Sequence, residues 1–165
     1  MREQFVYTQF MLNTTLCYIE NSGHYLMLLR NKKKLDLNEG KWIGIGGKLE
    51  ENETIEECML REVREETSLL LTSYRYRGVI DFVSDSAPEE IMHLYTATIP
   101  DMSSPIECKE GTLKWIPISE VSGLNLWEGD RVFLKLLLED APFFHLRLIY
   151  HGDSLISSET HYPNL

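Results

Sequence analysis

The sequence predicts an α/β fold in which a mixed central sheet is sandwiched between helices. Runs rich in β-branched and aromatic residues recur along the chain, and two segments, one in the middle and one late, carry apolar residues at helical spacing. Strands and helices that each bury one face pack together as layers. With 165 residues, of which 43% are hydrophobic and 25% are charged, the chain suits a single domain spanning residues 1–165.

The first two expected strands form a hairpin. Residues 14–19 and 24–30 are β-prone, and the Asn-Ser-Gly sequence between them is typical of a tight turn. The following segment, 31–40, is polar and turn-rich and contains three adjacent lysines, among them Lys33. Such a segment is either a solvated loop or a surface that faces phosphate groups.

A strand, a loop and a helix are expected next. Residues 42–45 form a short β-prone run before Gly46 and Gly47, and glycines let the backbone approach a ligand closely. Either Asn52 or Thr54 can cap the helix that follows, because both side chains accept a hydrogen bond from a free backbone N–H group. The buried side of this helix is formed by residues at spacing i, i+4, i+8: Ile55, Met59 and Val63.

The second half of the chain combines strands with a late helix. The β-prone runs at 74–84 and 91–99 suggest a second hairpin, and the apolar pattern within 130–139 predicts the late helix. The other expected elements are a short strand at 113–116, a helical turn at 118–121, and a last hairpin whose first strand is 143–150, with a polar tail from Ser157.

Composition limits the partners and the compartment. A net charge of −10 and a pI near 4.9 argue against a duplex nucleic-acid partner, because contacts to phosphates require clustered Lys and Arg. Three cysteines without metal-ligand spacing indicate reduced core thiols and a cytoplasmic protein. No apolar run approaches the length that crosses a membrane, so no membrane partner is expected. No feature of the sequence predicts an oligomeric state.

Acidic residues crowd the predicted middle helix. Glu62, Glu65 and Glu66 have the spacing i, i+3, i+4, so their carboxylates converge on one face of the helix. Unless the helix is an ordinary acidic surface, the repulsion between these carboxylates has to be relieved by a cation. Oxygen ligands without a His or Cys cluster favour Mg²⁺, or Mn²⁺, over Zn²⁺.

The segment 47–69 resembles the Nudix box. That box has the pattern G-x5-E-x7-R-E-U-x-E-E-x-G-U, in which U is an aliphatic residue, and Ser68 replaces its second glycine. The other specified positions match in fixed register: Gly47, Glu53, Arg61, Glu62, Val63, Glu65, Glu66 and Leu69. The resemblance implies a Nudix-type α/β/α sandwich and a hydrolase that uses Mg²⁺.

The same resemblance implies roles for single residues. The Gly46 carbonyl and the carboxylates of the helix face would surround the metal ion, and Arg61 would pair with Glu53 to hold the loop. Either Glu65 or Glu66 would position or deprotonate the attacking water. A metal or base contact is also implied for the loop glutamate at 110, or at 107 if the register slips: Glu110 or Glu107. The phosphate tail would meet a lysine, either Lys33 or Lys48.

Beyond the box, residues 18–155 resemble MutT-type Nudix hydrolases, in particular those that remove oxidised purine nucleoside triphosphates. Two local matches carry this resemblance, GKWIGIGGK at 40–48 and WEGD at 127–130. It implies that Trp127 stacks on the base, unless this residue only anchors the late helix, and that Asp130 forms hydrogen bonds with the base edge.

Three departures from that branch affect the base pocket. An acidic residue is replaced by Gly129, a base-contacting asparagine by Ile43, and an aromatic pocket residue by Leu37. Ile43 is therefore expected to contact the substrate without reading a polar edge. Fewer polar contacts predict weaker discrimination between bases.

The sequence thus predicts a Mg²⁺-dependent pyrophosphohydrolase of a nucleoside triphosphate, such as 8-oxo-dGTP or a related purine nucleotide, that releases a monophosphate and pyrophosphate. One alternative is a Nudix hydrolase of a nucleotide sugar, a dinucleoside polyphosphate or an RNA 5′ end. Another is a nucleotide-sensing module without turnover. Such modules tend to lose the carboxylates of the box, whereas this chain retains them.

Overall fold

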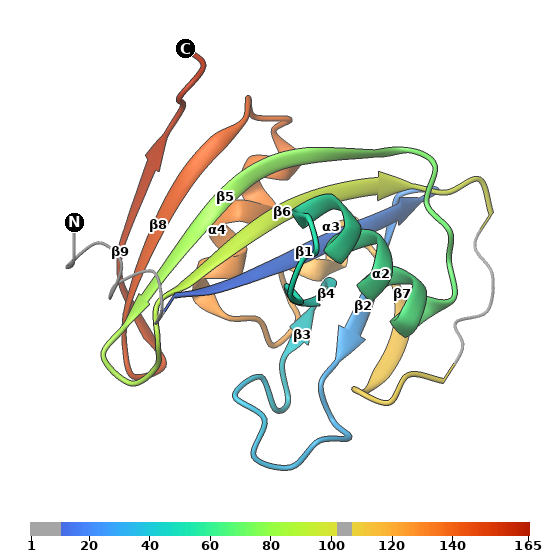
Figure 1. Cartoon of the computed structure of the whole chain (residues 1–165), viewed down its shortest axis with the longest axis horizontal. Helices are drawn as coiled ribbons and strands as arrows, with labels where there is room; N and C mark the ends of the chain where they lie inside the picture. Colours follow the sequence, from blue (N-terminus) through green and yellow to red (C-terminus); the bar gives the residue numbers. More distant parts are fainter. Residues whose placement is uncertain (1–10, 102–106) are drawn as a thin grey trace.

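The computed structural model describes residues 11–101 and 107–165, and in this part of the chain nine strands form one mixed sheet (Figure 1). The strands are β1 (Leu12–Asn21), β2 (His24–Leu29), β3 (Trp42–Ile43), β4 (Ile45–Lys48), β5 (Tyr74–Ser84), β6 (Glu90–Thr98), β7 (Thr112–Pro117), β8 (Phe144–His151) and β9 (Ser154–His161). The helices are α2 (Ile55–Thr67), α3 (Ile118–Val121) and α4 (Glu128–Leu138).

The order of the strands confirms the predicted mixed sheet. It is β3-β2-β1-β6-β5-β8-β9, while β4 pairs with β1 and β7 pairs with β2. The pairs β1–β6 and β5–β8 are parallel, and the other pairs are antiparallel. The first two predicted hairpins, β1–β2 and β5–β6, are both present.

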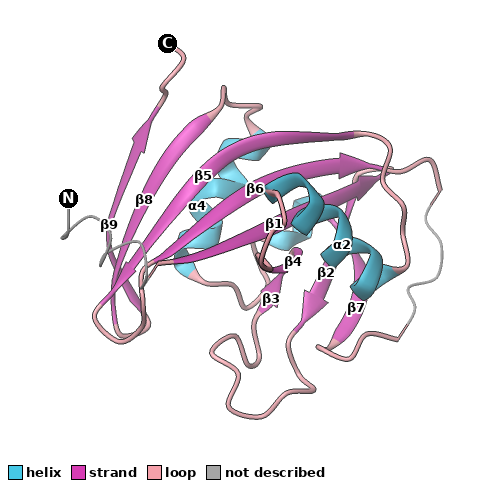
Figure 2. Ribbon diagram, viewed as in Figure 1, coloured by secondary structure: helices cyan, strands magenta, loops and turns pink. Residues whose placement is uncertain are grey.

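The two long helices cover opposite faces of the sheet (Figure 2). Alternate residues of a strand point to opposite faces, and β1 shows where each face packs. Cys17 belongs to the apolar cluster that contains Met59 of α2. Its neighbour Tyr18 belongs to the cluster that contains Phe133 of α4. The molecule is therefore an α/β/α sandwich with one core on each side of the sheet, as predicted.

Local hydrogen bonds determine where α2 begins and ends. Of the two expected caps, Thr54 is the one used, since its hydroxyl oxygen accepts a hydrogen bond from the N–H of Glu57 at 3.1 Å. At the other end, Ser68 has a φ of 62° and its N–H donates to the Arg64 carbonyl oxygen at 2.8 Å. A serine thus adopts the left-handed conformation for which the box pattern has glycine.

Two predictions about the elements are wrong. Gly46 and Gly47 lie in the strand β4 rather than in a loop, and β4 runs so close to β1 that a Cβ on Gly46 would lie 1.8 Å from the Thr15 carbonyl oxygen. The expected polar tail from Ser157 is part of the strand β9, which pairs with β8. β9 lies at the sheet edge with mostly exposed side chains, so it needs no apolar pattern.

The cysteines are buried and unpaired, as predicted: Cys17, Cys58 and Cys108. Among the described residues, no helix combines the length and the hydrophobicity that crossing a membrane requires. That residues 1–165 form a single domain stays a prediction.

Candidate active site

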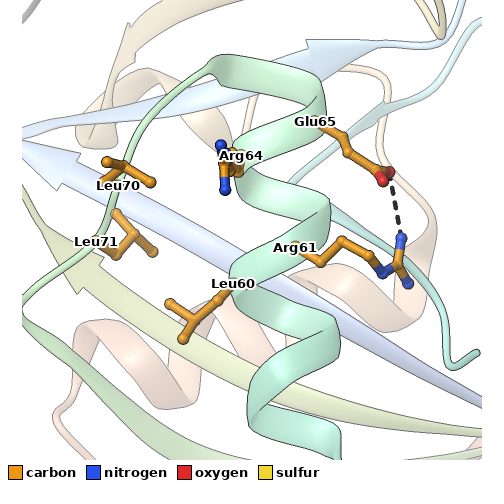
Figure 3. A pocket seen from close by; sticks show the side chains of 6 residues that line it. All are labelled: Leu60, Arg61, Arg64, Glu65, Leu70 and Leu71. Carbon is orange, nitrogen blue, oxygen red and sulfur yellow. Dashed lines mark hydrogen bonds and ion pairs between the residues drawn. The ribbon is translucent and has the colours of Figure 1, made fainter. Parts of the chain in front are cut away.

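Arg61, on α2, binds several of the carboxylates in the box. Its guanidinium holds Glu53 at two points, with Nε 2.6 Å from Oε2 and Nη2 2.9 Å from Oε1. Nη1 lies 2.8 Å from Glu62 Oε1 and 3.2 Å from Glu65 Oε2, and Figure 3 shows the second of these contacts. Nη2 also donates to the Lys48 carbonyl oxygen at 3.0 Å. One side chain thus ties the end of β4 and the loop before α2 to the helix.

The contact with Arg61 keeps Glu53 ionised. Hydrogen bonds from the guanidinium lower the pKa of Glu53 to about 2. The same hydrogen bonds raise the pKa of Arg61 above its already high usual value. Both groups are therefore charged at neutral pH, and their ion pair persists there.

Glu66 is the buried carboxylate of the site. It is 7% exposed, and within the described residues its Oε2 atom has no hydrogen-bond partner. Burial raises the pKa of Glu66 to about 8, and repulsion from Glu62 and Glu110 acts in the same direction. Arg30 and the backbone of Gly46 oppose this shift. The unpaired oxygen leaves a lone pair available to a cation.

Glu62 and Glu110 surround Glu66 as an acidic cluster. Burial raises the pKa of Glu62, Arg61 lowers it, and repulsion from Glu110 raises it further. Gly47 makes room for this cluster, since a Cβ at that position would lie 2.5 Å from the Glu62 carboxylate. The close approach of β4 to α2 therefore depends on this glycine.

The carboxylates fit a hard divalent cation, although they are not arranged as a finished binding site. In the part of the chain that the structure describes, no group of three or more His, Cys, Asp or Glu side chains is placed so that it could hold a metal ion. Glu62 and Glu65 are instead bound by Arg61. The unpaired oxygen of Glu66 and its repulsion by Glu62 and Glu110 are what a cation with oxygen ligands would relieve.

Arg30, directly after β2, is a residue of the site that sequence reasoning missed. Its Nη2 lies 3.0 Å from Glu110 Oε2, and its Nε lies 2.6 Å from Asp36 Oδ2. Arg30 therefore links the acidic cluster to the loop that follows β2. Of the two alternative loop glutamates, Glu110 joins this network, whereas Glu107 is exposed and lies 3.4 Å from Lys32. No local pattern in the sequence points to Arg30, because Glu110 lies far away along the chain.

A cavity of about 460 Å³ opens beside the acidic cluster. Its walls come from β1, β4 and β6 and from the start of α4, and its size suits a mononucleotide. Arg30, which pairs with Glu110, and Gly47, where an added Cβ would meet the Glu62 carboxylate, both line it, so the cavity adjoins the acidic cluster. Its lining includes every substrate-binding residue predicted from the sequence, together with Gly46: Lys33, Ile43, Lys48, Trp127 and Asp130.

Trp127, the residue before α4, is held in the cavity wall from several sides. Its indole N–H donates to Asn38 Oδ1 at 2.8 Å. Its ring meets Tyr150 edge-on with 5.8 Å between the ring centroids, and the Lys41 ammonium lies 4.9 Å from the indole centroid. The orientation of the indole is therefore set before a ligand binds, which reduces the entropy lost on stacking.

Asp130, in the first turn of α4, borders the cavity although it is only 4% exposed. Burial raises the pKa of Asp130 to about 8, and repulsion from Glu90 contributes. The neighbouring position, Gly129, has no space for a side chain. A Cβ there would lie 2.6 Å from the Tyr150 hydroxyl oxygen, which accepts the Gly129 N–H at 2.7 Å.

A second hollow, of about 560 Å³, lies between α2 and the segment that follows it (Figure 3). It contains none of the residues predicted to bind the base or the phosphates. The side chains that line it are Leu60, Arg61, Arg64, Glu65, Leu70 and Leu71. Although this hollow is larger, the residues predicted to bind the substrate meet in the other cavity, between β4 and α4.

Known proteins resemble this chain in sequence and in fold. The model of the NUDIX domain matches residues 11–137. The oxidized purine nucleoside triphosphate hydrolase of Mus musculus is 32% identical over 117 residues, which cover 70% of this chain and 74% of the relative. The protein of the same name from Danio rerio is 28% identical over 131 residues, covering 78% and 81%. The crystal structure of a MutT protein from Bacillus halodurans has a TM-score of 0.79 at 25% identity and covers 90% of this chain and 97% of that one.

The α/β/α sandwich, with an acidic helix beside a nucleotide-sized cavity, defines the class as a hydrolase of the MutT type. The chain belongs to the Nudix family. Nudix hydrolases generally use a divalent metal ion such as Mg²⁺, in agreement with the carboxylates around Glu66.

Proposed function

We propose that this Nudix hydrolase is a Mg²⁺-dependent pyrophosphohydrolase of nucleoside triphosphates, with 8-oxo-dGTP or a related purine nucleotide as substrate and a monophosphate and pyrophosphate as products. The observation that carries the proposal is that the cavity bordered by Trp127 and Asp130 adjoins the acidic cluster around Glu66. The names of the mouse and zebrafish relatives support the same substrate class. A cytoplasmic location is part of the proposal, and the unpaired cysteines support it.

Residues of the box and the loop before β7 would form the reaction centre. The metal ion would be held by the Gly46 carbonyl and by the carboxylates of Glu62, Glu65, Glu66 and Glu110. When bound, Mg²⁺ neutralises polyphosphate charge and lowers the pKa of a water molecule. Either Glu65 or Glu66 would accept the proton of the attacking water.

Other residues would position the substrate and the helix. Arg61 and Glu53 hold the loop before α2 against the helix, so they would keep the carboxylates in register. Lys33 or Lys48, both in the cavity lining, would bind the polyphosphate as a cation. Trp127 would stack on the base, and Ile43 would contact it through an apolar surface.

A substrate screen tests the proposal. The protein is incubated with nucleoside triphosphates, nucleotide sugars, dinucleoside polyphosphates and capped RNA, with Mg²⁺ or with a chelator, and the release of pyrophosphate and of phosphate is measured. We expect purine triphosphates to release pyrophosphate when Mg²⁺ is present and to release none when the chelator is present. Turnover of another diphosphate class would overturn the substrate assignment, and binding without any turnover would indicate a sensing module.

Replacing Trp127 by Ala is expected to lower kcat/KM by about 5- to 150-fold, which corresponds to about 1–3 kcal/mol of base stacking. The Mg²⁺ concentration needed for half-maximal activity should not change, because the indole is not part of the acidic cluster. Trp127→Phe keeps an aromatic face but lacks the N–H that donates to Asn38, so its kcat/KM should fall less than that of Trp127→Ala. A lower Tm with normal kinetics in the alanine variant would show that Trp127 only anchors α4.

Replacing Asp130 by Asn is expected to reduce the preference for 8-oxo-dGTP over dGTP more than it reduces activity on dGTP. The physical reason is that a polar group at the base edge discriminates between bases, whereas an apolar wall separates close analogues by only about 10- to 200-fold. The measurement is kcat/KM for both nucleotides in wild type and variant. An equal loss on both nucleotides would mean that Asp130 does not read the base.

A further inference from the structure

A second carboxylate borders the cavity close to Asp130. Glu90 is the first residue of β6, and its half-buried side chain is part of the cavity lining. The Thr14 hydroxyl, from the neighbouring strand β1, donates to Glu90 Oε1 at 2.7 Å. Glu90 is also close enough to raise the pKa of Asp130. Two acids from different elements, β6 and α4, therefore face the same space.

In the part of the chain that the structure describes, neither acid is paired with a cation. Within the described residues, no nitrogen of Lys, Arg or His lies within 4.0 Å of the Glu90 or the Asp130 carboxylate. Thr14 occupies one oxygen of Glu90 and leaves Oε2 for another donor. Buried polar groups are usually hydrogen-bonded, so this end of the cavity is suited to a ligand that brings its own N–H donors.

We propose that Glu90 is a specificity-determining residue of the base pocket, which reads the donor-bearing edge of a guanine-type base together with Asp130. This inference rests on the proposed function and adds a residue to it. Guanine and 8-oxoguanine carry two adjacent donors, the N1–H and the 2-amino group, and a carboxylate oxygen can accept from each. Hypoxanthine has the same six-membered ring edge without the 2-amino group, so it leaves one acceptor unpaired.

The apolar groups of the cavity do not distinguish these two bases. Trp127, Phe82 and Met92 present apolar surfaces, and every purine offers an equivalent π-face for stacking. Among the polar groups, the side-chain oxygen of Asn38 already accepts the indole N–H of Trp127, and the Asp36 carboxylate is bound by Arg30. Glu90 and Asp130 are the acceptors to which we assign discrimination by the 2-amino group.

The experiment compares monophosphate binding in the absence of metal, which requires no turnover. Wild type is expected to bind dGMP about 10- to 100-fold more tightly than dIMP, as measured by calorimetry, because a hydrogen bond to a charged group is at stake. Glu90→Gln should bring this ratio to within about threefold, since the neutral amide is a weaker acceptor. Thr14→Val removes the hydroxyl that orients Glu90 and should give an intermediate ratio.

Glu89→Gln is the matched control, because Glu89 directly precedes Glu90 in the chain but interacts with Asp81 and does not line the cavity. It should keep the wild-type ratio. An unchanged ratio in folded Glu90→Gln and Thr14→Val, or no preference for dGMP in wild type, would overturn the inference. Pyrophosphate release from dGTP and dITP is measured in parallel. Its absence would overturn the proposed function, while the binding ratio would still decide the role of Glu90.

Discussion

Replacing Glu66 by Gln is expected to lower kcat by about 10²- to 10⁴-fold, the range for the loss of a general base or its equivalent. The substitution keeps the shape of the side chain but removes the charge from the centre of the acidic cluster. The measurement is the steady-state release of pyrophosphate at saturating Mg²⁺. Glu57→Gln, at an exposed position in the first turn of the same helix, is the matched control and should keep kcat. A near-normal kcat for Glu66→Gln would exclude Glu66 from the reaction centre.

The same substitution is expected to make the metal-free protein more stable at alkaline pH. The pKa of Glu66 is about 8 in the folded protein against a usual value of 4.5, so folding favours the protonated form. This contribution to stability is full below about pH 4.5 and is lost as the pH rises through about 8. Ionised Glu66 then lowers the free energy of unfolding by up to about 5 kcal/mol relative to acidic pH.

Urea unfolding in a chelator, at about pH 6 and about pH 9, measures this effect. From about pH 6 to about pH 9, the free energy of unfolding should fall further in wild type than in Glu66→Gln. The difference between the two proteins isolates Glu66, because Asp130, whose pKa is also raised to about 8, is present in both. Identical pH dependence of wild type and variant would contradict the assignment of a buried carboxylate.

Replacing Arg61 by Ala is expected to lower the free energy of unfolding by about 1–3 kcal/mol, since the half-buried Glu53 loses the charged hydrogen-bond donor that holds it at two points. The Arg61 and Glu53 side chains are 21% and 10% exposed, so solvent screens part of their interaction. kcat should fall as well, because Glu62 and Glu65 lose the guanidinium that binds them both.

Arg64→Ala provides the control for this experiment. Arg64 lies three residues further along α2, in the lining of the hollow shown in Figure 3, and forms no ion pair within the described residues. Urea unfolding should place its change within about 0.5 kcal/mol of wild type. Equal losses in the Arg61 and Arg64 variants would show that the contacts of Arg61 do not contribute to stability.

Helical spacing made α2 and its polar face predictable. Side chains three and four residues apart share a face, so the positions of Arg61, Glu62 and Glu65 relative to one another follow from their numbers alone. β1 is buried without a break over residues 14–19, as expected for a strand with a core on each side of the sheet. These features depend on residues within one helix or strand, and the spacing of those residues in the sequence is enough to predict them.

Contacts between distant segments could not be predicted in this way. Thr14 and Glu90 are 76 residues apart, and Trp127 and Asn38 are 89 residues apart. A single polar residue at the end of a strand belongs to no repeating pattern, so the neighbouring sequence does not identify it as part of a pocket. The continuation of β9 from Ser157 onward was missed for a related reason, because backbone pairing with β8 holds this part of the strand and its side chains mostly face solvent.

Because the Tyr150 hydroxyl accepts the Gly129 N–H, substitutions at positions 129 and 150 affect each other during evolution. A carboxylate introduced at Gly129 alone would collide with that hydroxyl and with Leu148, whereas a smaller residue at 150 alone would leave the Gly129 N–H without its acceptor. A side chain at position 129 therefore needs space from both Tyr150 and Leu148, so the effects of substitutions at positions 129 and 150, 21 residues apart in the chain, are not expected to add. Lineages or libraries that acquire a second acid in the first turn of α4 should therefore change position 150 as well.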